Sequence, residues 1–132
     1  MLLPLSQCGW SADVIKASTS DGQHFLILER IDYTALSGKT ISLEPGDGSD
    51  GASDPRLLWD LIPPFGWYWP EAYLHDKLYR ATQEPKDECD SLFLEAMLRR
   101  AHSLKDRIEA NGLYMAVHLF GRDAFNADRR VA

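Results

Sequence analysis

The stretch from Trp69 to Arg80 constrains the fold of this chain more than any other. Pro70 suits the first turn of a helix, because the N–H that proline lacks would have no helical partner there. Glu71 favours the positive end of the helix dipole. We therefore predict a helix that begins here. Its pitch places His75 and Tyr79 on one face and turns Asp76 about 100° away from them.

A second helix is predicted from Lys86 to Ala101, after Pro85 breaks the first one. Asp90 lies on the apolar side of this helix, one turn before Phe93. A buried carboxylate needs a partner, because burying it alone costs several kcal/mol. Two helices joined by a short break usually pack antiparallel. We therefore expect Asp90 to face His75 and Tyr79.

The rest of the chain indicates an α+β fold, with a small N-terminal antiparallel sheet followed by a mainly helical half. Strand-forming residues gather at 23–33 and 39–43, which predicts two antiparallel strands. Residues 1–22 are expected to form an irregular arm, and residues 56–61 a short helix. A last helix is predicted from about Lys105 to Phe120, with an interruption at Asn111–Gly112, Phe120 on its core side and Gly121 as its cap. With 132 residues, 1–132 fits a single domain.

Composition excludes several classes of protein. The net charge of −6 argues against a nucleic-acid-binding surface, since phosphates attract Lys and Arg. No apolar run approaches the roughly 20 residues that span a bilayer, so we expect no transmembrane segment. The two cysteines are too few for a disulfide scaffold and fit a reducing compartment. The cytoplasm is therefore the expected location, unless the protein leaves the cell on a particle.

The two predicted helices bring together groups that could activate water. An acid on a neighbouring helix can hold one imidazole tautomer and leave the other ring nitrogen as a base. His75, Asp90 and Tyr79 are thus the candidate catalytic residues. Metal-assisted attack of water on an ester is the chemistry that such a set could perform.

A glycine-rich loop at residues 45–55 is the candidate metal-binding element. Its glycines permit positive φ angles, and its short polar side chains can bond neighbouring backbone. Asp50, the carbonyl groups near Gly48 and Gly51, and Asp76 of the first helix could form an oxygen-rich shell. Such a shell is typical of Ca²⁺ sites.

The pattern His75-Asp76-x-x-Tyr79, followed by Asp90-x-x-Phe93 on the next helix, resembles the active site of secreted phospholipases A-two. The short spacing is similar to the disulfide-free version in parvovirus capsids. This resemblance implies His75 as general base, Asp76 as the calcium carboxylate, Asp90 as the residue that orients His75, and Tyr79 as support for Asp90. It also implies an antiparallel helix pair and a phospholipid substrate. The glycine loop departs from the phospholipase pattern.

A second resemblance covers most of the chain. It is carried by five motifs: Ile41-Ser-Leu-Glu-Pro-Gly46, Ser49-Asp-Gly-Ala-Ser53-x-Pro55-x-x-x-Trp59, Leu74-His-Asp-x-Leu-Tyr79, Asp90-x-x-Phe93 and Tyr114-Met-Ala-Val-x-x-Phe120-Gly121. They resemble an uncharacterised domain family common in tailed phages and prophages. That resemblance implies a phage context, in an infected or lysogenic bacterium or in the virion, and it supplies no activity.

Two alternatives to catalysis stay open. His75, Tyr79 and Asp90 could form a satisfied polar network that ties two helices together without any reaction. The chain could also be a virion accessory protein of a phage head or tail, with virion proteins as partners. A phospholipid or another ester is the expected substrate only under the enzymatic interpretation.

Overall fold

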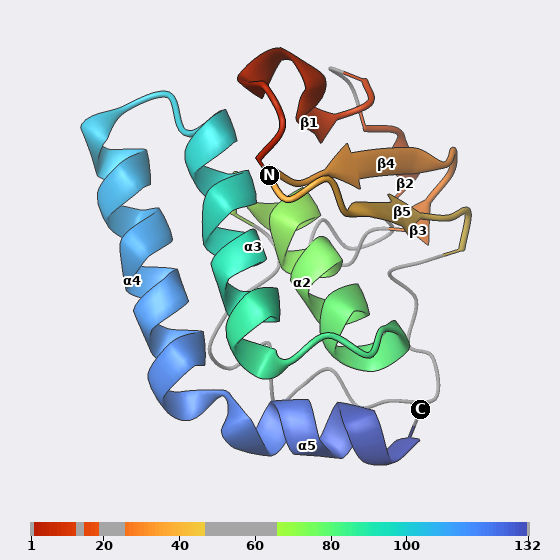
Figure 1. Ribbon diagram of the computed structural model, residues 1–132, viewed down its shortest axis with the longest axis vertical. Coiled ribbons are helices and arrows are strands. Elements are labelled where there is room, and N and C mark those ends of the chain that lie inside the picture. Colours follow the sequence, from red (N-terminus) through yellow and green to blue (C-terminus); the bar gives the residue numbers. More distant parts are fainter. Residues whose placement is uncertain (1, 13–14, 19–25, 47–65, 132) are drawn as a thin grey trace. The chain divides into compact units, whose positions relative to one another are not determined.

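The computed structural model describes residues 2–12, 15–18, 26–46 and 66–131, which belong to two compact units, Met1–Ser49 and Asp50–Ala132 (Figure 1). The first unit holds short strands and the second holds helices, so the predicted α+β class is confirmed. The glycine-loop residues Gly48, Asp50 and Gly51 and the short helix predicted at 56–61 lie outside the described residues. The single domain stays a prediction.

The first unit contains two small antiparallel sheets. A three-stranded sheet has the order β1 (Gly9–Trp10), β4 (Ile31–Thr34) and β5 (Thr40–Leu43), and a two-stranded sheet pairs β2 (Ala17–Ser18) with β3 (Leu26–Ile27). A single 3₁₀ turn, η1 (Leu5–Gln7), precedes β1. The segment expected to be an irregular arm therefore supplies β1 and β2. Both are only two residues long, too short for a periodic sequence signal.

The predicted hairpin is formed by β4 and β5. Ile31 pairs with Leu43 and Tyr33 with Ile41, and all four side chains are buried, while the residues between them are less so. This alternation is the one expected of a sheet with one covered face. Gly38 in the connecting turn has a φ of +92°, a conformation that glycine adopts at little cost. The single strand predicted at 23–33 is divided into β3 and β4, which belong to different sheets.

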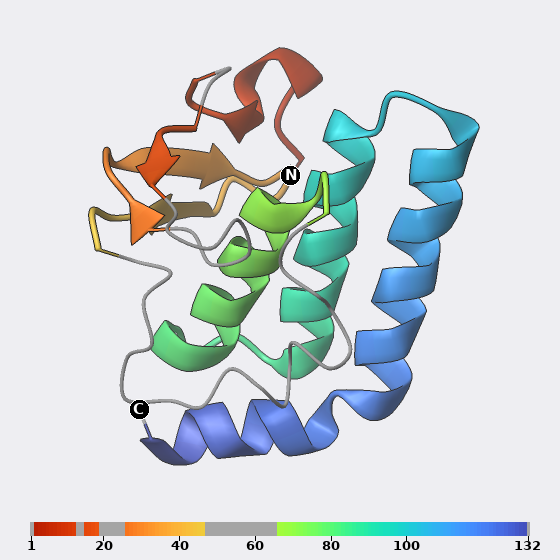
Figure 2. The same ribbon diagram turned by 180° about the vertical axis from the view of Figure 1, so that it is seen from behind.

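Four helices make up the described part of the second unit. They are α2 (Trp69–Ala81), α3 (Lys86–Arg100), α4 (Leu104–Phe120) and α5 (Arg122–Val131). Both ribbon views show α2, α3 and α4 side by side, each antiparallel to the next, with α5 lying crosswise to them (Figures 1 and 2). The antiparallel helix pair α2 and α3 was predicted, whereas α5 was not. None of the described helices is long and apolar enough to cross a membrane.

An ion pair between a buried carboxylate and a partly exposed guanidinium joins the start of α2 to the end of α3. Glu71 in the first turn of α2 accepts two hydrogen bonds from the Arg100 guanidinium, at 2.7 and 3.1 Å. The same guanidinium donates to the backbone carbonyl of Trp67. A two-point contact between Arg and a carboxylate fixes direction as well as distance. It therefore helps to set the position of α2 relative to α3, on which the candidate site depends.

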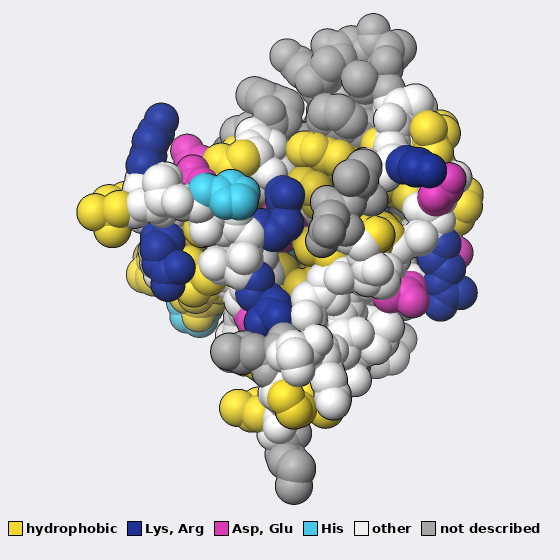
Figure 3. All heavy atoms as spheres, turned by 90° about the horizontal axis from the view of Figure 1, so that it is seen from above, with side chains coloured by type: hydrophobic (Ala, Val, Ile, Leu, Met, Phe, Trp, Pro, Cys, Tyr) yellow, Lys and Arg dark blue, Asp and Glu magenta, His cyan; other side chains and the backbone are white. Residues whose placement is uncertain are grey.

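Helix α4 runs without a break through Asn111 and Gly112, where we predicted an interruption. Its inner face is held by the buried Ala110 and Val117, and this packing outweighs the roughly 1 kcal/mol that a helical glycine costs. Its outer face exposes large apolar side chains: Leu104, Ile108, Met115 and Leu119. Hydrophobic side chains also reach the surface on the face shown in Figure 3. Phe120 is 71% exposed, so its predicted place in the core is wrong.

Gly121 separates α4 from α5 and is needed for close approach rather than for a left-handed cap. Its φ is −87°, which any residue can adopt, and its N–H bonds the carbonyl of Val117 at 2.9 Å. A Cβ atom at this position would lie 2.5 Å from that carbonyl oxygen and 3.3 Å from the Tyr79 hydroxyl. The turn between the two helices thus depends on the missing side chain.

We predict that Gly121→Ala lowers the free energy of unfolding by about 1–3 kcal/mol, because the new methyl group meets backbone that must shift. Gly112→Ala is the matched control. A Cβ there would contact nothing within 4 Å, so the change should raise stability by about 0.5–1 kcal/mol. Urea unfolding of both variants measures the two effects. Equal stability of the two variants would contradict the described turn.

Candidate functional site

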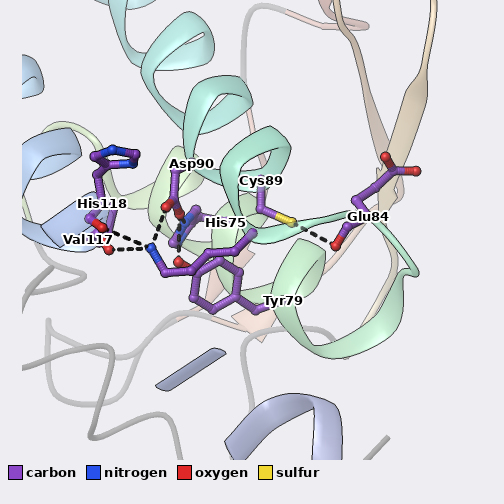
Figure 4. Close-up of polar contacts among 8 residues, drawn as sticks. His75, Tyr79, Glu84, Cys89, Asp90, Val117 and His118 are labelled. Atoms are coloured by element: carbon purple, nitrogen blue, oxygen red, sulfur yellow. Dashed lines mark hydrogen bonds and ion pairs between the residues drawn. The ribbon is translucent and has the colours of Figure 1, made fainter. Parts of the chain in front are cut away.

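The carboxylate of Asp90 on α3 is the centre of a buried polar cluster. Its Oδ1 atom lies 2.7 Å from Nε2 of His75 and accepts a hydrogen bond of 2.6 Å from the Tyr79 hydroxyl. Its Oδ2 atom accepts a hydrogen bond of 2.7 Å from Nζ of Lys86. Figure 4 shows the His75 and Tyr79 side chains beside the Asp90 carboxylate. The predicted contact of Asp90 with His75 and Tyr79 is therefore confirmed as geometry, while the catalytic roles stay predictions.

Sequence reasoning missed Lys86, the first residue of α3. Its Nζ atom also donates to the backbone carbonyls of Val117 and His118, at 2.7 and 3.3 Å. These carbonyls belong to the last turn of α4, and that of Val117 also accepts from the N–H of Gly121. The (i, i+4) spacing of Lys86 and Asp90 was a signal that could have revealed the pair.

Helical pitch brings these groups together. His75 and Tyr79 are one turn apart on α2, and Lys86 and Asp90 are one turn apart on α3. Leu74 and Leu78 are fully buried beside them, so the polar groups are carried into the interior with the apolar face of α2. The His75 ring packs against Tyr79 and Phe93, with ring centroids 4.2 and 4.7 Å apart.

The protonation states follow from burial and from these contacts. Burial raises the pKa of Asp90, but the hydrogen bonds from His75, Lys86 and Tyr79 outweigh it, so the pKa lies below the ordinary value. Burial lowers the pKa of His75 in spite of the neighbouring carboxylate. Burial and the bond to Asp90 raise the pKa of Tyr79. At neutral pH the cluster thus holds an anionic Asp90, a neutral His75 and a Tyr79 hydroxyl.

These states fix the tautomer of His75. Because Asp90 is ionised and can only accept, the Nε2 atom of the neutral imidazole carries the proton and donates it. The Nδ1 atom is therefore left with a lone pair. It has no hydrogen-bond partner among the described residues, although His75 is 0% exposed. Such a nitrogen is a base, and leaving it buried without a partner costs about 1–3 kcal/mol.

The predicted metal ligands are less well supported. Asp76 on α2 forms an ion pair with Arg80 at 3.2 Å, and the two residues are one helical turn apart. Asp50 and the carbonyl groups near Gly48 and Gly51 lie outside the described residues. Within the described ranges no group of three or more His, Cys, Asp and Glu side chains could hold a metal ion. The described donors alone therefore do not make a calcium site.

The strands of the first unit and the helices of the second define an α+β protein, and the helical unit holds a buried Lys–Asp–His network. A family model described as "Protein of unknown function (DUF1353)" matches residues 25–117, and the chain belongs to this family. Membership of an uncharacterised domain family is thus confirmed, while the phage association and the motifs stay predictions. Neither the comparison with curated proteins nor that with solved structures gave a match.

We predict that Asp90→Asn lowers the free energy of unfolding by about 3–5 kcal/mol at neutral pH, since the Lys86 ammonium would be left buried without its anion. Asp87→Asn on the same helix is the control. Asp87 is exposed, so its loss should cost no more than about 1 kcal/mol through the helix dipole. Denaturant titration compares both variants with the wild type. Similar losses in the two variants would show that Asp90 has no special role.

Proposed function

We propose that the domain is a hydrolase of the phospholipase type, in which Nδ1 of His75 is the general base. The observation that carries this proposal is the lone pair on Nδ1, which has no hydrogen-bond partner among the described residues, opposite an Nε2 atom bonded to Asp90 at 2.7 Å. A base held by a carboxylate through its other nitrogen is the arrangement that general-base hydrolysis requires.

The proposed reaction uses the groups of the cluster in turn. Nδ1 takes a proton from water while the water oxygen forms a bond to the acyl carbon of an ester. The imidazolium that results is stabilised by the anionic Asp90, whose Oδ1 atom also receives the Tyr79 hydroxyl. When the ester C–O bond breaks, the proton on Nδ1 passes to the departing alcohol oxygen. No group other than water and the ester is consumed.

The resemblance of His75-Asp76-x-x-Tyr79 and Asp90 to phospholipases A-two makes a phospholipid ester the proposed substrate. Since His75 is fully buried, the reaction needs a state in which water and the ester reach Nδ1. Catalytic contacts in unliganded proteins often form only when the substrate binds.

Calcium belongs to the proposal through the resemblance alone, with Asp76 and Asp50 as its carboxylates. Because the described donors do not form a site, we assign no step of the reaction to a cation. Calorimetric titration with CaCl₂ tests the ion directly. We expect heat of binding from the wild type and none from Asp76→Asn. If the wild type gives no heat, calcium is removed from the proposed function, and the proposed role of His75 as general base is unaffected.

The enzymatic proposal predicts that the wild type releases fatty acid from a dispersed short-chain phospholipid and that His75→Ala reduces the rate about 10²- to 10⁴-fold. His102→Ala is the matched control, since His102 is exposed and lies between α3 and α4. Its rate should equal that of the wild type. The assay is run with Ca²⁺ and with a chelator. No hydrolysis by the wild type under either condition would contradict the proposal.

A second candidate function is favoured by the complete burial of the cluster. His75 and Asp90 are both 0% exposed, and Lys86 ties them to the end of α4, so the cluster could serve only to join three helices. The protein would then be a non-catalytic accessory of a phage head or tail, a role that fits the phage context implied by the family resemblance. Detection of the protein in purified particles, together with the absence of hydrolysis, would support this second function.

A further inference from the structure

Lys86 makes all the hydrogen bonds that an ammonium group can donate. Its three N–H groups have three acceptors: Oδ2 of Asp90 and the backbone carbonyls of Val117 and His118. Figure 4 labels Asp90, Val117 and His118, the residues that supply these acceptors. A buried ion pair is expensive to desolvate, and an apolar side chain of similar volume often gives equal stability. Stability alone therefore does not explain why this buried position carries a charged side chain.

The contacts of Asp90 supply that explanation. Lys86 occupies Oδ2, which leaves Oδ1 to accept from His75 and Tyr79. Of the three groups that donate to Asp90 among the described residues, Lys86 alone carries a formal charge. A buried carboxylate with only neutral donors tends to take up a proton. A protonated Asp90 would donate to Nε2 of His75 instead of accepting from it.

We propose that Lys86 is a positioning residue that acts through Asp90 to keep the proton of His75 on Nε2 and the lone pair on Nδ1. Without the ammonium, the proton on Nε2 moves to Asp90, and Nδ1 takes up another proton from solvent. The cluster as a whole therefore gains one proton. The imidazole stays neutral and its tautomer is reversed. Nδ1 then has no lone pair with which to accept a proton from water.

The bonds to Val117 and His118 add a link to the fold. The ammonium sits at the C-terminal end of α4, where the helix dipole favours a positive charge. The same carbonyl of Val117 also accepts from Gly121, at the turn into α5. The end of α4 therefore provides the site that holds the Lys86 ammonium. The tautomer of His75, on α2, depends on a helix end far away in sequence.

Nitrogen-15 NMR of the His75 ring tests this inference, because protonated and lone-pair ring nitrogens have well-separated resonances. We expect the proton on Nε2 in the wild type and on Nδ1 in folded Lys86→Met. Lys105→Met removes an exposed lysine of α4 and is the control, with the wild-type tautomer expected. A folded Lys86→Met that keeps the proton on Nε2 would overturn the inference.

If Lys86→Met does not fold, NMR of the wild-type protein provides the test. The Lys86 ammonium should give N–H signals that are protected from exchange and coupled across the hydrogen bond to the Asp90 carboxylate, together with a proton on Nε2 of His75. An unprotected ammonium, or a proton on Nδ1, would overturn the inference. The importance of the tautomer for catalysis rests on the proposed function. The tautomer itself does not, so inactivity in the ester assay leaves this test intact.

Discussion

The second unit depends on one buried carboxylate. Asp90 receives a hydroxyl and an imidazole N–H from α2 on one oxygen and an ammonium from its own helix on the other. Each donor is itself fixed: Lys86 by the end of α4, and His75 and Tyr79 by the ring contacts around them. Because an unpaired charge in such a place is expensive, the three helices have few alternative ways to pack. The same contacts that hold the helices also determine the chemistry of His75.

The central pair of helices could be predicted because local signals and helical pitch agree. Pro70 marks the start of α2, Pro85 precedes α3, and a carboxylate on an apolar face requires a partner. Those rules were sufficient to predict that Asp90 faces His75. Lys86 escaped prediction because a lysine at the start of a helix usually lies in solvent, and two of its three acceptors are backbone carbonyls some thirty residues away. Helix α5 was missed because its sequence is mostly polar, with few apolar residues to mark a buried face.

The two functional proposals differ in what they require of one nitrogen atom. A structural network is complete when its polar groups are satisfied, whereas Nδ1 of His75 has no hydrogen-bond partner among the described residues. That atom favours a catalytic role for His75 over a purely structural one. The burial of the imidazole ring favours the structural role. Both proposals depend on the same ionised Asp90, and the difference between them lies in access to the imidazole.

The charge of Asp90 is therefore the quantity to measure first. Titration of its side-chain carboxyl carbon by ¹³C NMR reports the protonation state of this residue alone. The account predicts an ionised carboxylate from neutral pH down to below about 3.9, the ordinary pKa of an aspartate, because the hydrogen bonds from His75, Lys86 and Tyr79 outweigh burial. A carboxyl group that is protonated at neutral pH, or that titrates above the ordinary value, would contradict it.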